Sequence, residues 1–148
     1  MRYEVELPDG QRATFAETFR PLVTNDAVGL LREIEIKAPA GATALLNCAA
    51  EAKSRELSSS APPGGAPSVP ILTLHDNEGP LVLSVRAAPV AASWLTAAEQ
   101  PGVVLALPCD VADGVARLTL AILRAKDSSP EGIKRLVEQE SSERRGSP

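Results

Sequence analysis

RYEVELPDGQRATFAETF, residues 2 to 19, decides how the fold begins. Apolar residues alternate with polar ones on both sides of a turn, and a period of two places the apolar set on one face of a strand. Tyr3 and Phe15 belong to these two apolar sets. Pro8 presets its own φ and Gly10 can adopt a positive φ, so the residues between the two runs suit a tight turn. The stretch therefore predicts an antiparallel hairpin with one solvated face.

Short apolar runs bounded by turn residues continue along the chain. VGLLREIEIK, residues 28–37, predicts a third strand with a bulge near Gly29 and with Arg32 on its solvent side. ATALLNCAA, residues 42–50, predicts a fourth strand that is central because it is more apolar, although the composition of residues 42–56 also suits a helix. Four more runs follow: VPILTLHD (69–76), GPLVLSVRAAP (79–89), GVVLALP (102–108) and GVARLTLAILRA (114–125). The last run has the strongest pattern, and we expect it to be central.

The carboxy-terminal stretch has a different pattern. Ser129 is suited to the N-cap and Pro130 to the first position of a helix. Ile133, Leu136 and Val137 then form a narrow apolar stripe at helical spacing. This stripe predicts a short, highly charged helix that docks on the rest of the fold or leads to something beyond it.

These patterns together predict a mainly β protein. Short strands at this spacing indicate an antiparallel β-sandwich of about seven to nine strands with a C-terminal helix. We expect residues 1–127 to form the sandwich and residues 128–148 the helix and tail. Residues 58–68, SSSAPPGGAPS, predict a flexible loop inside the sandwich domain.

Composition narrows the classes of function. The chain has 148 residues, 44% of them hydrophobic, and a net charge of −4. An acidic chain is repelled by phosphate, so we expect no nucleic-acid partner. No apolar run approaches the ~18 residues needed to span a membrane, and the start lacks a signal-peptide pattern. As the chain stands, this predicts a cytoplasmic protein or a piece of a longer exported one, with no membrane insertion.

The densest polar cluster is His75-Asp76-Asn77-Glu78. Imidazole and carboxylate groups can bind metal or transfer protons, so His75, Asp76 and Glu78 are candidates for a small hydrolase or metal site. The cluster lies between two apolar runs and precedes a Gly-Pro pair, which favours a turn. His75 is the one histidine, and the sequence contains no G-x-S-x-G motif to support a Ser-His-Asp site.

The few aromatic residues bear on carbohydrate binding, which needs exposed rings that stack on sugars. Tyr3, Phe15 and Phe19 fall on apolar faces, and we expect them in the core. Trp94 is the one aromatic residue that could be exposed as a ligand platform, although packing is the more ordinary role.

Two further sets of reactive residues are better explained by structure than by chemistry. Alternation places Glu4, Glu6, Glu33 and Glu35 on solvated strand faces, with Arg2, Arg12, Arg32 and Lys37 as cross-strand partners. Cys48 and Cys109 lie 60 residues apart, unlike the closely paired ligands of a zinc site. We expect them to be small buried residues, or to form one disulfide if neighbouring strands bring them together.

Residues 3–41, YEVELPDGQRATFAETFRP…LLREIEIKAPAG, carry a resemblance to a known family. With the later ARLTLAIL, the order of Tyr3, Arg20-Pro21 and Leu30/Leu31-Arg32 with Ile34 resembles a β-sandwich module of large exported proteins from planctomycetes and their relatives, over most of residues 2–125. Those proteins also carry c-type cytochrome and propeller domains. The resemblance implies a periplasmic location, but without a Cys-x-x-Cys-His motif this chain cannot attach a c-type haem.

These observations predict a non-catalytic accessory or interaction module and not an enzyme. It would act through a sheet face, an edge strand or the loops, with a protein partner or by self-association, and without a cofactor. One alternative is a carbohydrate-binding module that uses Trp94. The other is a small hydrolase or metal site at His75, Asp76 and Glu78.

Overall fold

The fold consists of two antiparallel sheets and one helix. The computed structural model describes residues 1–39, 41–49, 54–58, 69–76, 78–88, 92–95, 103–109 and 114–146. In this part of the chain the strands are β1 (Arg2–Glu6), β2 (Arg12–Val23), β3 (Ala27–Lys37), β4 (Thr43–Ala49), β5 (Ser54–Ser58), β6 (Ile71–Asp76), β7 (Gly79–Ala87), β8 (Ser93–Leu95), β9 (Val103–Pro108) and β10 (Val115–Ala125), and the helix is α1 (Pro130–Gly146).

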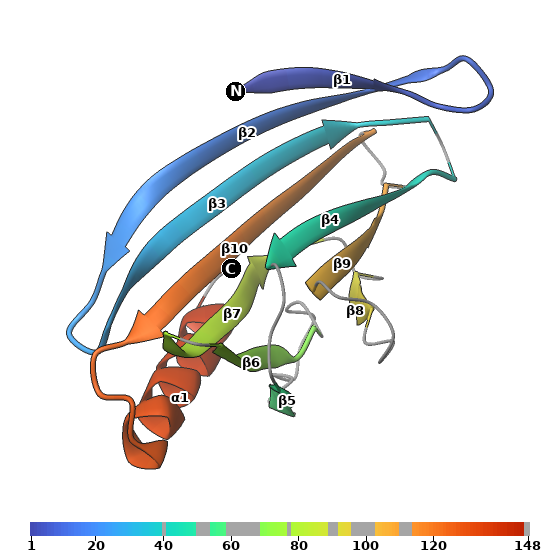
Figure 1. Ribbon diagram of the computed structural model, residues 1–148. Coiled ribbons are helices and arrows are strands. Elements are labelled where there is room, and N and C mark those ends of the chain that lie inside the picture. Colours follow the sequence, from blue (N-terminus) through green and yellow to red (C-terminus); the bar gives the residue numbers. More distant parts are fainter. Residues whose placement is uncertain are drawn as a thin grey trace.

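The described strands form two layers of unequal size (Figure 1). The large sheet has seven strands in the order β1-β2-β3-β10-β7-β6-β5, and the small sheet has three in the order β4-β9-β8. Each strand pair is antiparallel. The predicted mainly β, antiparallel sandwich with a C-terminal helix is therefore confirmed, and β10 lies at the centre of the large sheet as expected.

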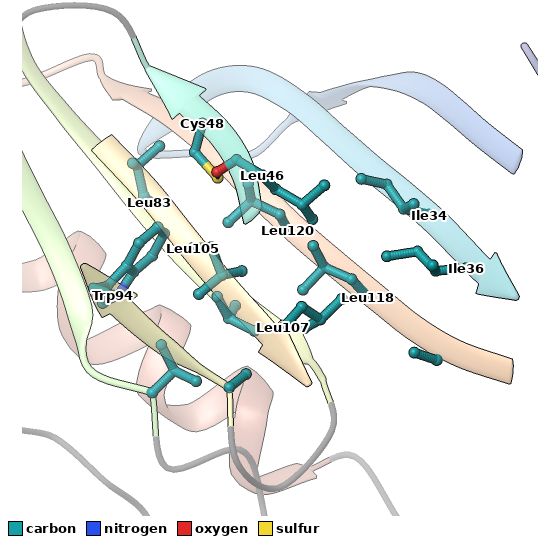
Figure 2. Close-up of a cluster of buried hydrophobic side chains, with 14 of the residues drawn as sticks. Ile34, Ile36, Leu46, Cys48, Leu83, Trp94, Leu105, Leu107, Leu118 and Leu120 are labelled. Carbon is teal, nitrogen blue, oxygen red and sulfur yellow. The ribbon is translucent and has the colours of Figure 1, made fainter. Parts of the chain in front are cut away.

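The main core lies between the two sheets. Because side chains alternate across a strand, every second residue of β3 and β10 points toward the small sheet. Figure 2 shows these side chains facing those of β4 and β9. The fully buried large residues of this layer are Ile34, Ile36, Leu72, Leu74, Leu83, Leu105, Leu107, Leu118 and Leu120.

The helix α1 covers part of the other face of the large sheet. It begins as predicted: the Ser129 hydroxyl accepts a hydrogen bond from the Gly132 amide at 3.2 Å, and Pro130 is the first helical residue. The predicted apolar stripe packs into a second buried cluster with Ala27, Ile71, Val82, Ala121 and Leu123, in which Leu136 is 1% exposed. The helix therefore docks on the sandwich.

Two predictions about β3 are wrong. Its register with β2 and with β10 is continuous, so there is no bulge at Gly29. Gly29 is needed for close approach instead, because an added Cβ would lie 1.9 Å from the Ile122 carbonyl oxygen. Arg32 was expected on the solvent side, but it shares the inner face with Ile34 and Ile36.

The structure also differs in which strands it contains and where they lie. β4 is a strand and not a helix, but it is an edge of the small sheet and not a central strand. The described residues contain ten strands, because the sequence patterns missed the short β5 and β8. Residues 59–68 of the expected loop lie outside the described residues.

The two cysteines are free and buried. β4 and β9 run antiparallel, with Thr43 opposite Pro108, so Cys109 lies near the start of β4 and Cys48 near its end. Their separation of about five to six strand residues corresponds to roughly 20 Å, far more than a disulfide permits. The prediction of two small buried residues is confirmed, and the disulfide is not formed.

Candidate interaction surface

An exposed apolar patch lies on the inner face of the large sheet. Phe19, Pro21 and Val23 of β2 lie beside Val28 and Leu30 of β3, because the register pairs Pro21 with Leu30 and Val23 with Val28. All five side chains are exposed, and Val23 is 66% exposed. We call these five residues the β2–β3 patch. They share the strand face that forms the sandwich core further along the same strands.

The patch is exposed because the small sheet is shorter than the large one. β2 and β3 continue beyond the end of β4 (Figure 1). Near that end, the Asn47 carbonyl oxygen accepts a hydrogen bond from the Arg32 guanidinium at 3.2 Å. Arg32 therefore marks the boundary of the patch: towards Ile34 the inner face is buried, and from Leu30 onward no described element packs over β2 and β3.

A buried ion pair separates the patch from the core. The Glu17 side chain is 5% exposed and accepts a hydrogen bond from Nε of Arg32, whose side chain is 14% exposed. The Tyr3 hydroxyl donates to the other Glu17 oxygen at 3.1 Å. The Arg32 guanidinium also lies over the Phe19 ring, 5.7 Å from its centroid. Arg32 thus connects the ion pair to the first residue of the patch.

Burial and the neighbouring Glu17 carboxylate change the acidity of Tyr3. Desolvation by burial raises the pKa of the Tyr3 phenol, and the negative charge of Glu17 raises it further. The phenol therefore stays protonated and continues to donate to Glu17. This favours a fixed polar boundary over a proton-transfer site.

The edge of β2 beside the patch has an interrupted hydrogen-bond ladder. Glu17 bonds Met1 through both its amide and its carbonyl, so its backbone groups point away from β3. By alternation, the backbone groups of Phe19, Pro21 and Val23 point to the same side, where no described strand pairs. Proline lacks the amide hydrogen and is found in sheets at such edges. Pro21 therefore weakens this edge as a template for another strand.

A polar groove lies on the opposite face, between the β2–β3 turn, β7 and α1. It has a volume of about 560 Å³. Its arginines pair with carboxylates of the same protein: Arg86 makes two hydrogen bonds of 3.0 and 2.9 Å to Glu140, and Arg135 makes one of 3.2 Å to Asp127. Gln139 also donates to Asp26. Both arginines that line the groove are therefore paired within the protein.

The predicted polar cluster falls at the β6–β7 hairpin. His75 is half-buried in β6, opposite Pro80 of β7. Glu78 is exposed in the turn, with an oxygen 3.9 Å from Arg124. The Asp76 side chain and Asn77 lie outside the description. Among the side chains that are described, no three His, Cys, Asp or Glu residues gather closely enough to hold a metal ion.

Of the three aromatic residues expected in the core, Tyr3 and Phe15 pack with it and Phe19 does not. Tyr3 and Phe15 stack with centroids 5.0 Å apart and pack with the main core. Trp94 is 8% exposed, and its Nε1 donates to the Pro70 carbonyl oxygen at 2.7 Å. A buried indole offers little face for a sugar to stack on. Phe19, expected in the core, is 47% exposed.

The cysteine thiols are not activated. Burial raises the pKa of Cys48 to about 11, and the nearby Arg32 charge offsets only part of this effect. Burial also raises the pKa of Cys109. Since the thiolate is the nucleophile, both residues are poorly reactive in the folded protein at neutral pH.

The patch is a site that sequence reasoning missed. Alternation placed Phe19 on an apolar face, but it carried no information on where the opposing sheet ends. Pro21 was the available signal, because proline inside an apolar strand marks an edge. The sequence reading used Pro21 only as a matching position in the family resemblance.

Comparisons with known proteins found no relatives. No family model matches the chain, and neither a curated protein nor a solved structure is significantly similar to it. The resemblance to the planctomycete-type module stays a prediction. In the part of the chain that the structure describes, no helix has both the length and the apolar character needed to cross a membrane.

Proposed function

We propose that this chain is a non-catalytic interaction module that binds a protein partner through the β2–β3 patch. The observation that carries the proposal is the contiguous apolar surface formed by Phe19, Pro21, Val23, Val28 and Leu30. Their exposed fractions correspond to roughly 400 Å² of surface, a size that is often functional on a soluble protein. An accessory role in a larger exported protein is what the sequence resemblance implies.

The energetics support a moderate affinity. Removing roughly 400 Å² of apolar surface from water contributes about 10 kcal/mol at 25 cal/mol per Å². Association itself costs about 4–15 kcal/mol, before the partner's own buried surface is added. The two terms are of similar size, so the patch contributes to binding and the partner's own buried surface supplies the remainder.

The rigidity of the support also favours binding. The patch residues lie on two strands that pair with each other, and β3 also pairs with β10 along its whole length. The ion pair of Arg32 and Glu17 further restrains Phe19 through the contact between its ring and the guanidinium. A surface formed in advance loses little conformational entropy on binding, which leaves more of the contact free energy as affinity.

Site-specific photo-crosslinking tests this proposal. A benzophenone amino acid replaces Phe19 in the full chain, and a matched variant carries it at Leu45, which is 63% exposed on β4, away from the patch. We expect one protein of defined mass to crosslink from position 19 in an extract of the source cells. The adduct should be absent from position 45 and lost when Val28→Asp is added. Equal labelling from both positions, or no adduct dependent on Val28, would reject the proposal.

A further inference from the structure

The area of the β2–β3 patch limits what can cover it. A symmetric dimer buries the same surface on both copies, so this patch would give roughly 800 Å² in total. Stable interfaces between proteins bury about 1,200–2,000 Å². The patch is thus too small to hold two copies together stably by itself. A single helix laid on it would bury a similar total, so we expect a partner helix to bind weakly or transiently.

Addition of an extended strand is also disfavoured. At the β2 edge, Pro21 supplies no amide hydrogen in the middle of the three outward-facing residues. At β4, the Asn47 carbonyl oxygen is already bonded to Arg32. Strand addition depends on an uninterrupted row of main-chain donors and acceptors, and the β2 edge beside the patch lacks one.

A helix matches the dimensions of the patch. From Phe19 to Val23 the strand rises about 14 Å, and neighbouring strands lie about 4.8 Å apart. A helix of three turns is about 16 Å long and about 10 Å wide. Its apolar residues at i, i+3 or i+4, and i+7 would lie along this surface.

The protein already packs a helix on the other face of the same sheet, where α1 lies mainly against β7 and β10. The stripe of Ile133, Leu136 and Val137 in α1 packs against a buried cluster that includes Ala27 of β3 and Leu123 of β10. At this end of the large sheet, α1 thus covers β7 and β10 on one face, while on the other face β2 and β3 carry the exposed patch.

From these observations we infer that the β2–β3 patch receives one amphipathic helix of a protein partner, in a layer of its own opposite α1. The inference rests on the proposed function and names the structural class of the bound segment. The partner helix carries a single apolar stripe about three turns long.

A designed peptide library provides the probe. Each 16-residue peptide has an Ala, Glu and Lys helical background, with Leu, Ile, Val or Phe varied at four stripe positions. We expect selected peptides to bind the full chain and to shift the amide NMR signals of residues 19–30. Leu30→Asp should weaken binding at least tenfold, whereas Leu45→Asp on β4 should leave it unchanged. Val23→Asp, at the most exposed patch position, serves as a second variant if Leu30→Asp does not fold.

Each alternative occupant of the patch would give a different experimental result. Equal binding of peptides with a central proline would show an extended segment and overturn the helix inference. A dimer found by light scattering, and abolished by Val23→Asp, would overturn it in favour of a second copy. If crosslinking from position 19 succeeds while no helical peptide binds, this inference fails and the proposed function stands. If both fail, the proposed function fails as well.

Discussion

Breaking the ion pair between Glu17 and Arg32 should destabilise the fold strongly. Glu17→Ala removes the acceptor for the Tyr3 hydroxyl and for Nε of Arg32, and leaves a guanidinium that is 14% exposed. A hydrogen bond to a charged group contributes about 1.5–3 kcal/mol, and breaking a buried pair costs about 3–5 kcal/mol. Because Arg32 keeps its bond to the Asn47 carbonyl oxygen, we expect a loss of about 3 kcal/mol.

The double mutant separates this interaction from other effects. Arg32→Ala should cost a similar amount, but the two changes together should cost about 2 kcal/mol less than the sum, because each single variant leaves an unpaired charge. Urea unfolding, followed by fluorescence of the buried Trp94, measures these free energies. The exposed pair of Arg12 and Glu4 is the control, with an expected coupling below about 0.5 kcal/mol. Additive costs at Glu17 and Arg32 would refute the reasoning.

Four other predictions concern the helix, its N-cap and one cysteine. Leu136→Ala should lower the free energy of unfolding by about 2–5 kcal/mol, measured in urea, because the side chain anchors α1 and is 1% exposed. Ser129→Ala should cost about 1 kcal/mol by removing the N-cap. In the wild type, hydrogen bonds from Ser129 lower the pKa of Asp127. An NMR titration of Ser129→Ala should therefore show a higher pKa for this carboxyl group. Cys48, with a pKa of about 11, should resist a thiol reagent at pH 8 until the protein is unfolded.

Each of these predictions has a clear opposite result. An unchanged free energy of unfolding in Ser129→Ala would mean that its hydroxyl does not stabilise the start of α1. A change below about 1 kcal/mol for Leu136→Ala would mean that α1 is not anchored by this residue. An unchanged pKa of Asp127 in Ser129→Ala would exclude the Ser129 hydroxyl as its cause, because the backbone amide of residue 129 keeps its bond to Asp127. Rapid modification of Cys48 in the folded protein would show that the thiol is accessible or activated.

Much of the fold follows from local patterns in the sequence. The alternation around Tyr3 and Phe15 and the turn at Gly10, where φ is +85°, predict the first hairpin that the structure contains. Ser129 and Pro130 predict the start of α1 for an equally local reason, since a cap acts within one helical turn. Such features depend on residues only a few positions away in the chain, so they can be predicted directly from the sequence.

Features that depend on distant segments were decided by the tertiary structure. The apolar content of β4 suggested a central strand, but pairing placed it at an edge of the small sheet. The period of two already places Arg32 on the face of Ile34 and Ile36, so the solvent-side prediction misapplied a local pattern, but only the fold brought Glu17 beside it as a buried partner. In both cases the number and position of the surrounding strands decide the outcome, and composition does not encode these directly.

The exposure of Phe19 shows most clearly what sequence alternation does not predict, namely how deeply a residue on an apolar face is buried. By itself, the sequence determined that Phe15 and Phe19 share one face of β2, because side chains alternate with a period of two. Only the tertiary structure decided that Phe15 is 9% exposed and Phe19 is 47% exposed. The physical reason is that burial depends on where the opposing sheet ends, and β4 ends in the neighbourhood of Arg32, between the buried and the exposed parts of that face.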